Sequence, residues 1–249
     1  MKKASPASAA KPTTKRPSVR RAVERAAEER EPRGARRKRE TREKLLEAAF
    51  RLMAERGMDA VAINEITEAA DVGFGSFYNH FESKEAVYAA LMDSVFVEFG
   101  DALARLVRDI EDPAELVAIC VRHTVQRSAR EPLWGRFLIR EGFSPRALTR
   151  GLGLRLLQDI QNGIAKGRFS MPDPPMSVIA VGAGVLGAIA AQIESDAQQR
   201  LILTQLGLDT ESLPSRTAAV LLHGLGLPFD EAEQIARRPL PVVDQTAGN

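Results

Sequence analysis

Cys120 and His123 carry the most reactive side chains in the chain, and their spacing places both on one face of a predicted helix. A thiol beside an imidazole occurs in zinc sites and in nucleophile–base pairs. The chain holds one Cys and three His, so a zinc site would lack ligands, and no orienting group or oxyanion loop is visible. We therefore expect no enzyme, no cofactor and no metal site. Cys120 is interpreted as a small core residue, and the sequence leaves open whether its thiol senses redox state.

A second group of residues that could bind a ligand is the glycine series Gly182, Gly184 and Gly187. The run lacks the Lys-Ser/Thr that completes a phosphate-binding loop, so we reject that interpretation. The surrounding residues 177–193 carry no charge, and the length of this uncharged run is just short of a membrane span. Three glycines and the absence of a Trp/Tyr belt favour a helix packed closely against other helices instead.

The elements that position these residues are predicted to be helices. Aromatic residues make up 5% of the chain and hydrophobic residues 44%, and no alternating strand pattern is visible. Prolines stand near the expected helix starts, where a missing N–H costs little. The fold class is therefore all-α. Beyond residue 112 we expect helices at about 113–130, 132–141, 145–167, 175–206 and 214–237.

The charge is unevenly distributed along the chain. Residues 1–40 hold 14 Lys/Arg against 5 Asp/Glu, whereas the remainder holds 21 against 28. A basic arm on an acidic body favours a polyanionic partner that is met at one end. The arm is rich in Pro, Ser, Thr and Ala and is expected to be disordered. The single Cys fits a reducing, cytoplasmic environment.

From Thr41 onward, apolar residues recur at helical spacing. Thr41 is a plausible N-cap of the first helix, Gly57 its stop, and Ser83 the cap of a long helix that runs to about Ile110. Two short helices lie between them, at about 63–70 and 74–81, and are separated by Asp71-Val72-Gly73. This order fits a helix-turn-helix.

The core of this motif is predicted from its apolar positions. Ile63, Ile66 and Ala70 are expected to point inward, Val72 to fill the corner, and Phe77 and Phe81 to complete the core. Ala69 and Ala70 are expected to allow the second short helix to approach closely.

The run ITEAADVGFGSFYNHFESKEAVYAAL closely resembles the signature of TetR-type repressors. The strong resemblance covers about residues 39–99. It implies a disordered arm over 1–38, a helix-turn-helix domain over 39–99 with the motif at about 62–81, a helical effector-binding and dimerisation domain over 100–238, and a flexible tail over 239–249. The matching positions are Ile66, Ala70, Val72, Gly75, Phe77, Tyr78, His80, Phe81 and Lys84.

Three positions depart from the family pattern. Asp71 replaces the usual turn Gly, but Asp tolerates a left-handed backbone better than most residues, so the turn should survive. Gly73 replaces a Ser whose hydroxyl would cap the second short helix. Ala62 replaces a Thr that commonly caps the first.

The resemblance implies that the second short helix enters the major groove of DNA. Phe74, Ser76 and Asn79 are then the candidates for base edges, although Phe74 can equally fold inward. Tyr78 and Lys84 are candidates for phosphate contacts, and His80 either reaches phosphate or locks the helix junction. The complete predicted DNA-binding set is Arg39, Arg42, Asn64, Gly73, Phe74, Ser76, Phe77, Tyr78, Asn79, His80 and Lys84.

The second short helix contains no Lys or Arg, so electrostatic attraction to DNA must come from elsewhere. Arg36, Arg37, Lys38, Arg39 and Arg42 precede or open the first helix, and we expect this arm to reach a neighbouring groove or to lie along the phosphate backbone.

The resemblance also implies a homodimer on a palindromic operator, with pairing through helices at about 175–206 and 214–226, and a pocket for a small, mostly apolar effector of unknown identity. Arg136 and Arg140 can meet an anionic group there, but solvated positions are favoured for both. The alternative is an architectural or effector-independent DNA-binding protein. The candidate pocket residues are His123, Trp134, Phe137, Leu138 and Phe143.

Overall fold

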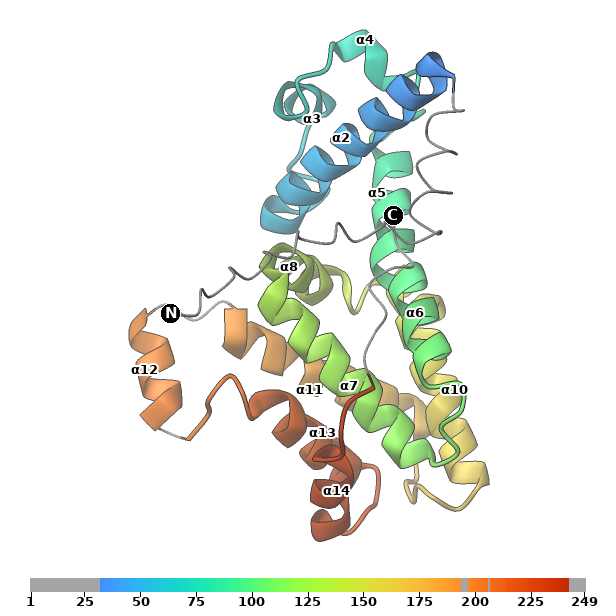
Figure 1. The fold of residues 1–249 in the computed structure, drawn as a ribbon, viewed down its shortest axis with the longest axis vertical. Coiled ribbons are helices and arrows are strands. Elements are labelled where there is room, and N and C mark those ends of the chain that lie inside the picture. Colours follow the sequence, from blue (N-terminus) through green and yellow to red (C-terminus); the bar gives the residue numbers. More distant parts are fainter. Residues whose placement is uncertain (1–31, 194–196, 206, 242–249) are drawn as a thin grey trace, which may run out of the picture. The chain divides into compact units, whose positions relative to one another are not determined.

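The computed structural model describes residues 32–193, 197–205 and 207–241, and every regular element in these ranges is helical (Figure 1). The all-α fold class is thereby confirmed. The chain divides into two units, residues 1–42 and 43–249. The helices are α2 (Arg33–Arg56), α3 (Ile63–Ala69), α4 (Phe74–Phe77), α5 (Lys84–Met92), the π-helical η1 (Asp93–Glu98), α6 (Phe99–Leu106), α7 (Pro113–Arg130), α8 (Pro132–Glu141), α9 (Pro145–Thr149), α10 (Gly151–Ala165), α11 (Pro174–Ile193), α12 (Ala197–Gln205), α13 (Leu213–Gly224) and α14 (Phe229–Ala236).

Prolines and side-chain caps set several helix starts. Pro113, Pro132 and Pro145 each occupy the first turn of a helix, as predicted. The side chains of Ser83 and Asp112 accept backbone N–H groups at the starts of α5 and α7. The predicted bounds 113–130 and 132–141 are confirmed without change.

The first helix begins earlier than the sequence suggested. Helix α2 starts at Arg33, so the disorder expected over residues 1–38 does not hold for Arg33 to Lys38; residues 1–31 lie outside the described part. Thr41 is not an N-cap, because it lies inside α2 and its hydroxyl donates to the carbonyl of Arg37 at 2.9 Å. Gly57 ends the helix as predicted, with φ of +82°.

Two of the long helices expected in the body are interrupted at glycines. The helix predicted over 145–167 breaks at Gly151, whose φ is +53° and where a Cβ atom would lie 2.3 Å from the Phe96 carbonyl oxygen. The helix predicted over 214–237 breaks around Gly226, with φ of +101°, and Pro228 precedes the next helix. The helix expected over 175–206 is α11 followed by α12, with residues 194–196 outside the described part.

The long helix expected over 83–110 forms as three consecutive segments, α5, η1 and α6. The middle segment is π-helical over six residues, and its Val95 and Phe96 are both buried. Such wide turns are rare and occur mostly at functional positions. The composite helix ends at Leu106, a turn before the expected Ile110.

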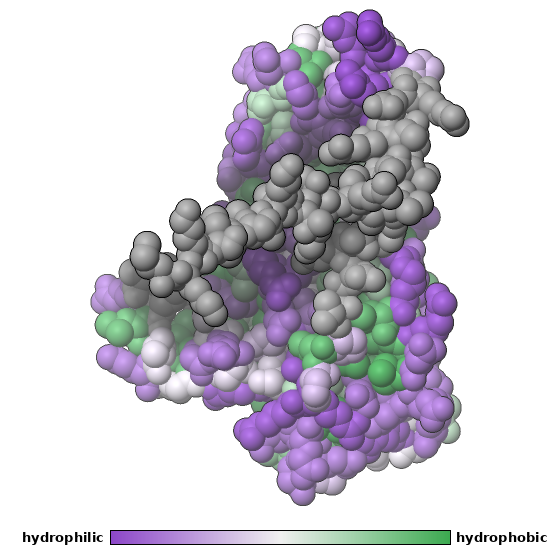
Figure 2. Space-filling view, viewed as in Figure 1, coloured by the Kyte–Doolittle hydropathy of each residue, from purple (hydrophilic) through white to green (hydrophobic). Residues whose placement is uncertain are grey.

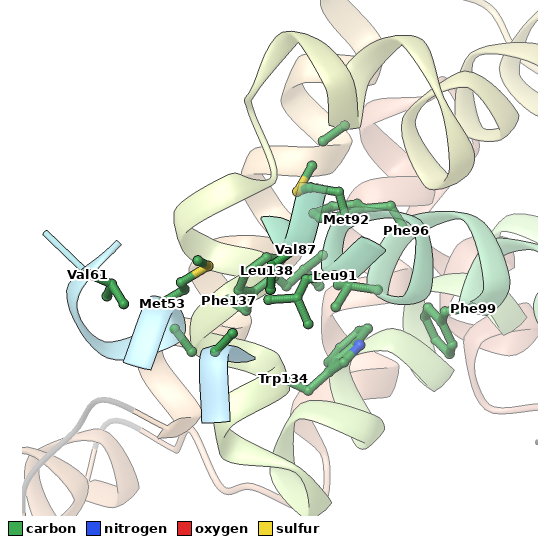
Figure 3. Close-up of a cluster of buried hydrophobic side chains, with 14 of the residues drawn as sticks. Met53, Val61, Val87, Leu91, Met92, Phe96, Phe99, Trp134, Phe137 and Leu138 are labelled. Carbon is green, nitrogen blue, oxygen red and sulfur yellow. The ribbon is translucent and has the colours of Figure 1, made fainter. Parts of the chain in front are cut away.

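The core of residues 43–99 continues into α8. Figure 3 shows Phe137 and Leu138 of α8 beside Val87 and Leu91 of α5, and all four are buried. The Phe137 ring centroid lies 5.4 Å from that of Phe50 in α2. The helix-turn-helix segment therefore shares one apolar core with the body and does not stand apart from it.

A second apolar core joins α7, α10, α11, α13 and α14. Its most buried members include Ile160, Leu222 and Ile235. The end of the described chain returns to α7, where Arg238 forms an ion pair with Glu115. These contacts hold the end of the described chain against α7, the first helix after the composite α5–η1–α6 helix.

Candidate nucleic-acid interface and ligand cavity

The turn between α3 and α4 has the predicted left-handed residue. Asp71 is the only described non-glycine residue with positive φ, at +53°. The N–H of Val72 then donates to the carbonyl of Thr67 at 2.9 Å, and the Thr67 hydroxyl donates to the carbonyl of Asn64. An Asp in this conformation is strained relative to Gly, so the turn is formed at a small energetic cost.

Helix α3 begins without the side-chain cap that Thr would provide. Glu65 compensates, because its carboxylate accepts the Ala62 N–H at 2.8 Å and pairs with Arg56 at 2.8 Å. The backbone hydrogen bond from Ala62, followed by the hydrogen bond from Arg56, lowers the pKa of the Glu65 carboxyl. The loss of the expected Thr is thus offset by a carboxylate one turn later.

The helix-turn-helix core follows the prediction at four of its positions. Ile66 and Phe77 are fully buried, and Ala70 and Phe81 nearly so. Ala69 departs from the prediction because its side chain is exposed, so the close approach of the two helices depends on Ala70.

The outward face of α4 and the turn that follows presents an aromatic and polar surface. Phe74 is 54% exposed and Tyr78 53% exposed, with their rings edge-to-face at 5.8 Å. Asn79 is exposed and Ser76 half-buried. Of the two alternatives for Phe74, the structure therefore shows the outward one, in which the ring is accessible to a partner.

Phe77 does not belong to this surface. It was included among the predicted DNA contacts, but its side chain is fully buried between the aromatic rings of Tyr78 and Phe81. In this conformation it cannot touch DNA, and its contribution is to hold α4 against the core. The role of Phe77 in the motif is therefore to pack in the core.

The remaining predicted contacts are accessible to different degrees. Arg39, Arg42, Asn64 and Gly73 are exposed, whereas His80 and Lys84 are half-buried. Lys84 opens α5 directly after the Ser83 cap, where the positive end of the helix dipole adds to its charge.

The body contains a cavity of about 350 Å³ that is partly open to solvent and whose wall is mostly apolar. Leu138 and Phe143, two of the predicted pocket residues, line it. Phe96 of η1 and Leu103 of α6 also line it, so the composite helix forms part of the wall. Residues 113–238 supply most of the rest, from α7, α9, α10 and α11.

The other three predicted pocket residues lie outside this lining. Trp134 packs edge-to-face on Phe99 at 5.0 Å, and Phe137 belongs to the core shared with α2 and α5. His123 Nε2 lies 3.1 Å from the Pro241 carbonyl oxygen on the chain's return to α7. Their aromatic character suggested a pocket, but it serves packing between helices. Arg140, also considered near a ligand, donates to the Glu55 carbonyl at 3.0 Å.

The sequence prediction missed the polar members of the cavity wall. The titratable or charged lining residues are Arg108, Cys120, Arg155 and Asp159. Burial raises the pKa of the Asp159 carboxyl to about 6, and Arg155 only partly offsets this. Arg155 and Asp159 are four residues apart and are the only charged residues of α10, and this spacing was a signal that could have identified them.

Cys120 lines the cavity but does not resemble a reactive thiol. Burial raises the pKa of the Cys120 thiol to about 12, so the sulfur stays protonated at neutral pH. Among the residues that the structure describes, no cluster of three His, Cys, Asp or Glu side chains is arranged to hold a metal ion.

Two family profiles match the chain. Residues 45–91 match "Bacterial regulatory proteins, tetR family", and residues 112–238, about half of the chain, match "Tetracyclin repressor-like, C-terminal domain".

Curated relatives match part of the chain. The HTH-type transcriptional repressor DhaR of Mycobacterium sp. (strain GP1) is 38% identical over 72 residues, which are 29% of this chain and 36% of DhaR. NicS of Pseudomonas putida, also an HTH-type transcriptional repressor, is 31% identical over 140 residues, 52% of this chain and 66% of NicS. The matched segment thus spans about a third of DhaR.

Solved structures match over a larger part of the chain. RolR in complex with resorcinol is 34% identical with a TM-score of 0.59, and the match covers 84% of this chain and 99% of RolR. AibR in complex with isovaleryl coenzyme A and operator DNA is 19% identical with a TM-score of 0.55, covering 73% and 98%. The likeness to AibR shows the fold alone.

Proposed function

The chain belongs to the TetR family of bacterial regulatory proteins, and from this premise we propose that it is a cytoplasmic repressor released from a palindromic operator by a small, mostly apolar effector. One observation carries the proposal. A single composite helix, α5–η1–α6, begins at the accessible aromatic face of the helix-turn-helix and also forms a wall of the apolar cavity. An effector that favours one position of this helix therefore changes the position of the DNA-contacting face.

For DNA, the proposal assigns base edges to Phe74, Ser76 and Asn79 and phosphates to Tyr78 and Lys84. The exposed rings of Phe74 and Tyr78 support it, because solvent-exposed aromatic side chains next to a helix N-terminus suit thymine methyl groups and sugar–phosphate surfaces. Asn64 and Gly73 are accessible at the starts of α3 and α4. Arg39 and Arg42 would add the positive charge that α4 lacks.

For the effector, Leu138 and Phe143 remain proposed contacts, joined by Phe96 from the composite helix. The volume of about 350 Å³ falls at the small end of the range for ligand pockets. RolR, which resembles this chain over most of its length, was solved with resorcinol, a small ring compound. This supports an effector of similar size.

The homodimer is proposed to form through α11 and α13. Met176 and Ile179 of α11 are 54% and 42% exposed, and Val220 of α13 is 60% exposed. By length and composition α11 could cross a membrane, with a mean hydropathy of 2.0 and only 22% of that window buried. Within this family, a second copy explains such an exposed apolar face better than a bilayer does.

Apolar surface also extends over α12, as Figure 2 shows. Leu201 and Ile202 of that helix are 59% and 49% exposed. We include this helix at the edge of the proposed dimer surface, since it follows α11 in the chain.

Footprinting on the DNA that flanks the gene tests the operator assignment. We expect protection of a palindrome, and loss of that protection for Phe74→Ala. Phe229→Ala is the matched control, because it removes an equally exposed aromatic ring from α14. Diffuse binding without a protected palindrome would contradict the repressor assignment.

The same footprint separates the proposal from an architectural protein that has no effector. Adding small apolar and ring compounds should abolish protection for at least one compound, and substituting Ala104, a small lining residue, by Trp should prevent that release by filling the cavity. Protection that no compound changes would favour the effector-independent alternative.

A further inference from the structure

One carboxylate stands in the cavity without a compensating partner. Asp159 of α10 is the only Asp or Glu among the described lining residues, and the structure gives its carboxyl no hydrogen bond and no ion pair there. Most of the cavity wall to which it belongs is apolar, including Leu156 of the same helix and Val117 of α7. Asp159 is half-buried, and a carboxyl in such a setting with unused acceptor capacity gains from a ligand that supplies a donor.

The nearest cation is already engaged. Arg155 lies one turn before Asp159 on α10, and its guanidinium pairs with Asp101 of α6. It therefore brings positive charge close to Asp159 without neutralising it. Arg108, the other cation in the wall, is exposed.

The Thr124 hydroxyl in the wall also presents an acceptor, whereas Gln158, another polar lining residue, is exposed. The buried Thr124 hydroxyl donates its proton to the carbonyl of Cys120 at 2.7 Å, which leaves lone pairs on Oγ1. The Cys120 thiol is protonated and is a weak donor and weak acceptor. Asp159 and Thr124 thus favour a ligand that brings its own hydrogen-bond donors.

We propose that Asp159 is the hydrogen-bond acceptor for the hydroxyl group of a neutral, single-ring effector, with Thr124 available to a second hydroxyl. This inference rests on the proposed function and names the ligand class of its cavity. Carboxylate ligands are disfavoured because they would face Asp159, and the positive charge of Arg155 beside it weakens the attraction that Asp159 would otherwise exert on an ammonium ligand. A pure hydrocarbon fits the wall but leaves the Asp159 carboxyl without a donor.

The size of the cavity agrees with this class. A cavity of roughly 150 Å³ accommodates benzene, so about 350 Å³ leaves room for a substituted ring. Resorcinol, the compound in the RolR complex, carries two hydroxyl groups on one benzene ring. It is therefore the first probe to use.

The test is calorimetric titration of the full-length chain with resorcinol, phenol, benzoate, benzylamine and toluene at neutral pH. Resorcinol should bind most tightly and benzoate most weakly. Asp159→Leu should weaken resorcinol binding about tenfold to a hundredfold, the range for a hydrogen bond to a charged group. Asp159→Asn keeps an acceptor oxygen and should lose less. Asp109→Asn, an exposed carboxylate outside the cavity lining, should leave the affinity unchanged.

Three results would overturn the inference: equal resorcinol affinity in the wild type and Asp159→Leu, benzoate binding as tight as that of resorcinol, or no binding by either hydroxylated ring. Misfolding does not confound the test, because removing a buried charge is expected to stabilise the fold. Operator footprints recorded on the same variants keep the two proposals separate. A chain that protects its operator and is released by another class of compound retains the proposed function while refuting the role of Asp159.

Discussion

Replacing Asp159 by Asn should remove a specific pH dependence of stability, and no effector is needed to observe it. Burial raises the pKa of the Asp159 carboxyl from 3.8 to about 6 in the folded chain. The folded state therefore holds this proton more tightly than the unfolded state. Between about pH 4 and pH 6 the folded chain binds more protons, so its stability falls as the pH rises.

The magnitude follows from the two pKa values. A rise from 3.8 to about 6 corresponds to about 3 kcal/mol if the carboxyl is fully shielded. Part of the group remains in contact with solvent, so we expect about 1–2 kcal/mol. Below about pH 4 the carboxyl is protonated in both states, and the stability contribution is then fully present.

Urea unfolding of the wild type and Asp159→Asn at several pH values measures this difference. Because Asn does not titrate, the two chains should have similar free energies of unfolding near about pH 4. The variant should become more stable by about 1–2 kcal/mol near about pH 7.5. Taking the difference between the chains cancels the titration of every other group. A difference that is independent of pH, or one that grows toward low pH, would refute the assignment of Asp159 as an uncompensated buried carboxyl.

Three further predictions concern the DNA-contacting part of the chain. Asp71→Gly should raise the free energy of unfolding by about 0.5–1 kcal/mol because it relieves a left-handed Asp, whereas Asp71→Val should lower it by about 1–2 kcal/mol. Urea titration measures both changes, and equal stability of the two variants would contradict the strained turn. Ile66→Ala should destabilise the chain by about 2–4 kcal/mol through the cavity it leaves in a fully buried site, and a loss below about 1 kcal/mol in thermal or urea unfolding would be inconsistent with that burial. Deleting residues 1–39 should flatten the salt dependence of operator affinity, measured by fluorescence anisotropy, since basic residues of the arm are proposed to release counterions; an unchanged slope would exclude the arm from DNA.

The sequence predicted elements wherever a local signal sets a boundary. Pro113 and Pro132 occupy the first turns of their helices, and Ser83 caps its helix, so those starts were correct. The break at Gly151 in the helix predicted over 145–167 was missed because its cause is tertiary. The backbone of Phe96, more than fifty positions away, requires a residue without Cβ there. Thr41 failed as a cap because helical sequence precedes it and α2 starts at Arg33.

The proposed DNA-contacting face was easier to predict than the cavity. Phe74, Tyr78 and Asn79 lie on one continuous motif, so the sequence placed them together, although it left open whether the Phe74 ring faces outward. The cavity wall is assembled from helices that are distant in sequence. Large aromatic residues such as Trp134 and Phe137 therefore seemed the natural choice, whereas they fill the core between α5 and α8. Among the polar residues left at the wall, Thr124 has no distinctive local pattern, whereas Asp159 could have been identified only from its spacing with Arg155.

The return of the chain end to α7 has a consequence for synthesis. Arg238 pairs with Glu115 across 123 positions, and the Arg122 guanidinium donates to the Arg238 carbonyl at 2.6 Å. During translation α7 emerges long before the helices that cover it, α13 and α14. The apolar face of α7 stays uncovered while nearly half of the chain is still being synthesised, and contacts between residues so distant in sequence form slowly. The nascent body is thus exposed to aggregation until its last helices leave the ribosome, and a premature stop in α13 would produce an aggregation-prone chain in place of a shortened repressor.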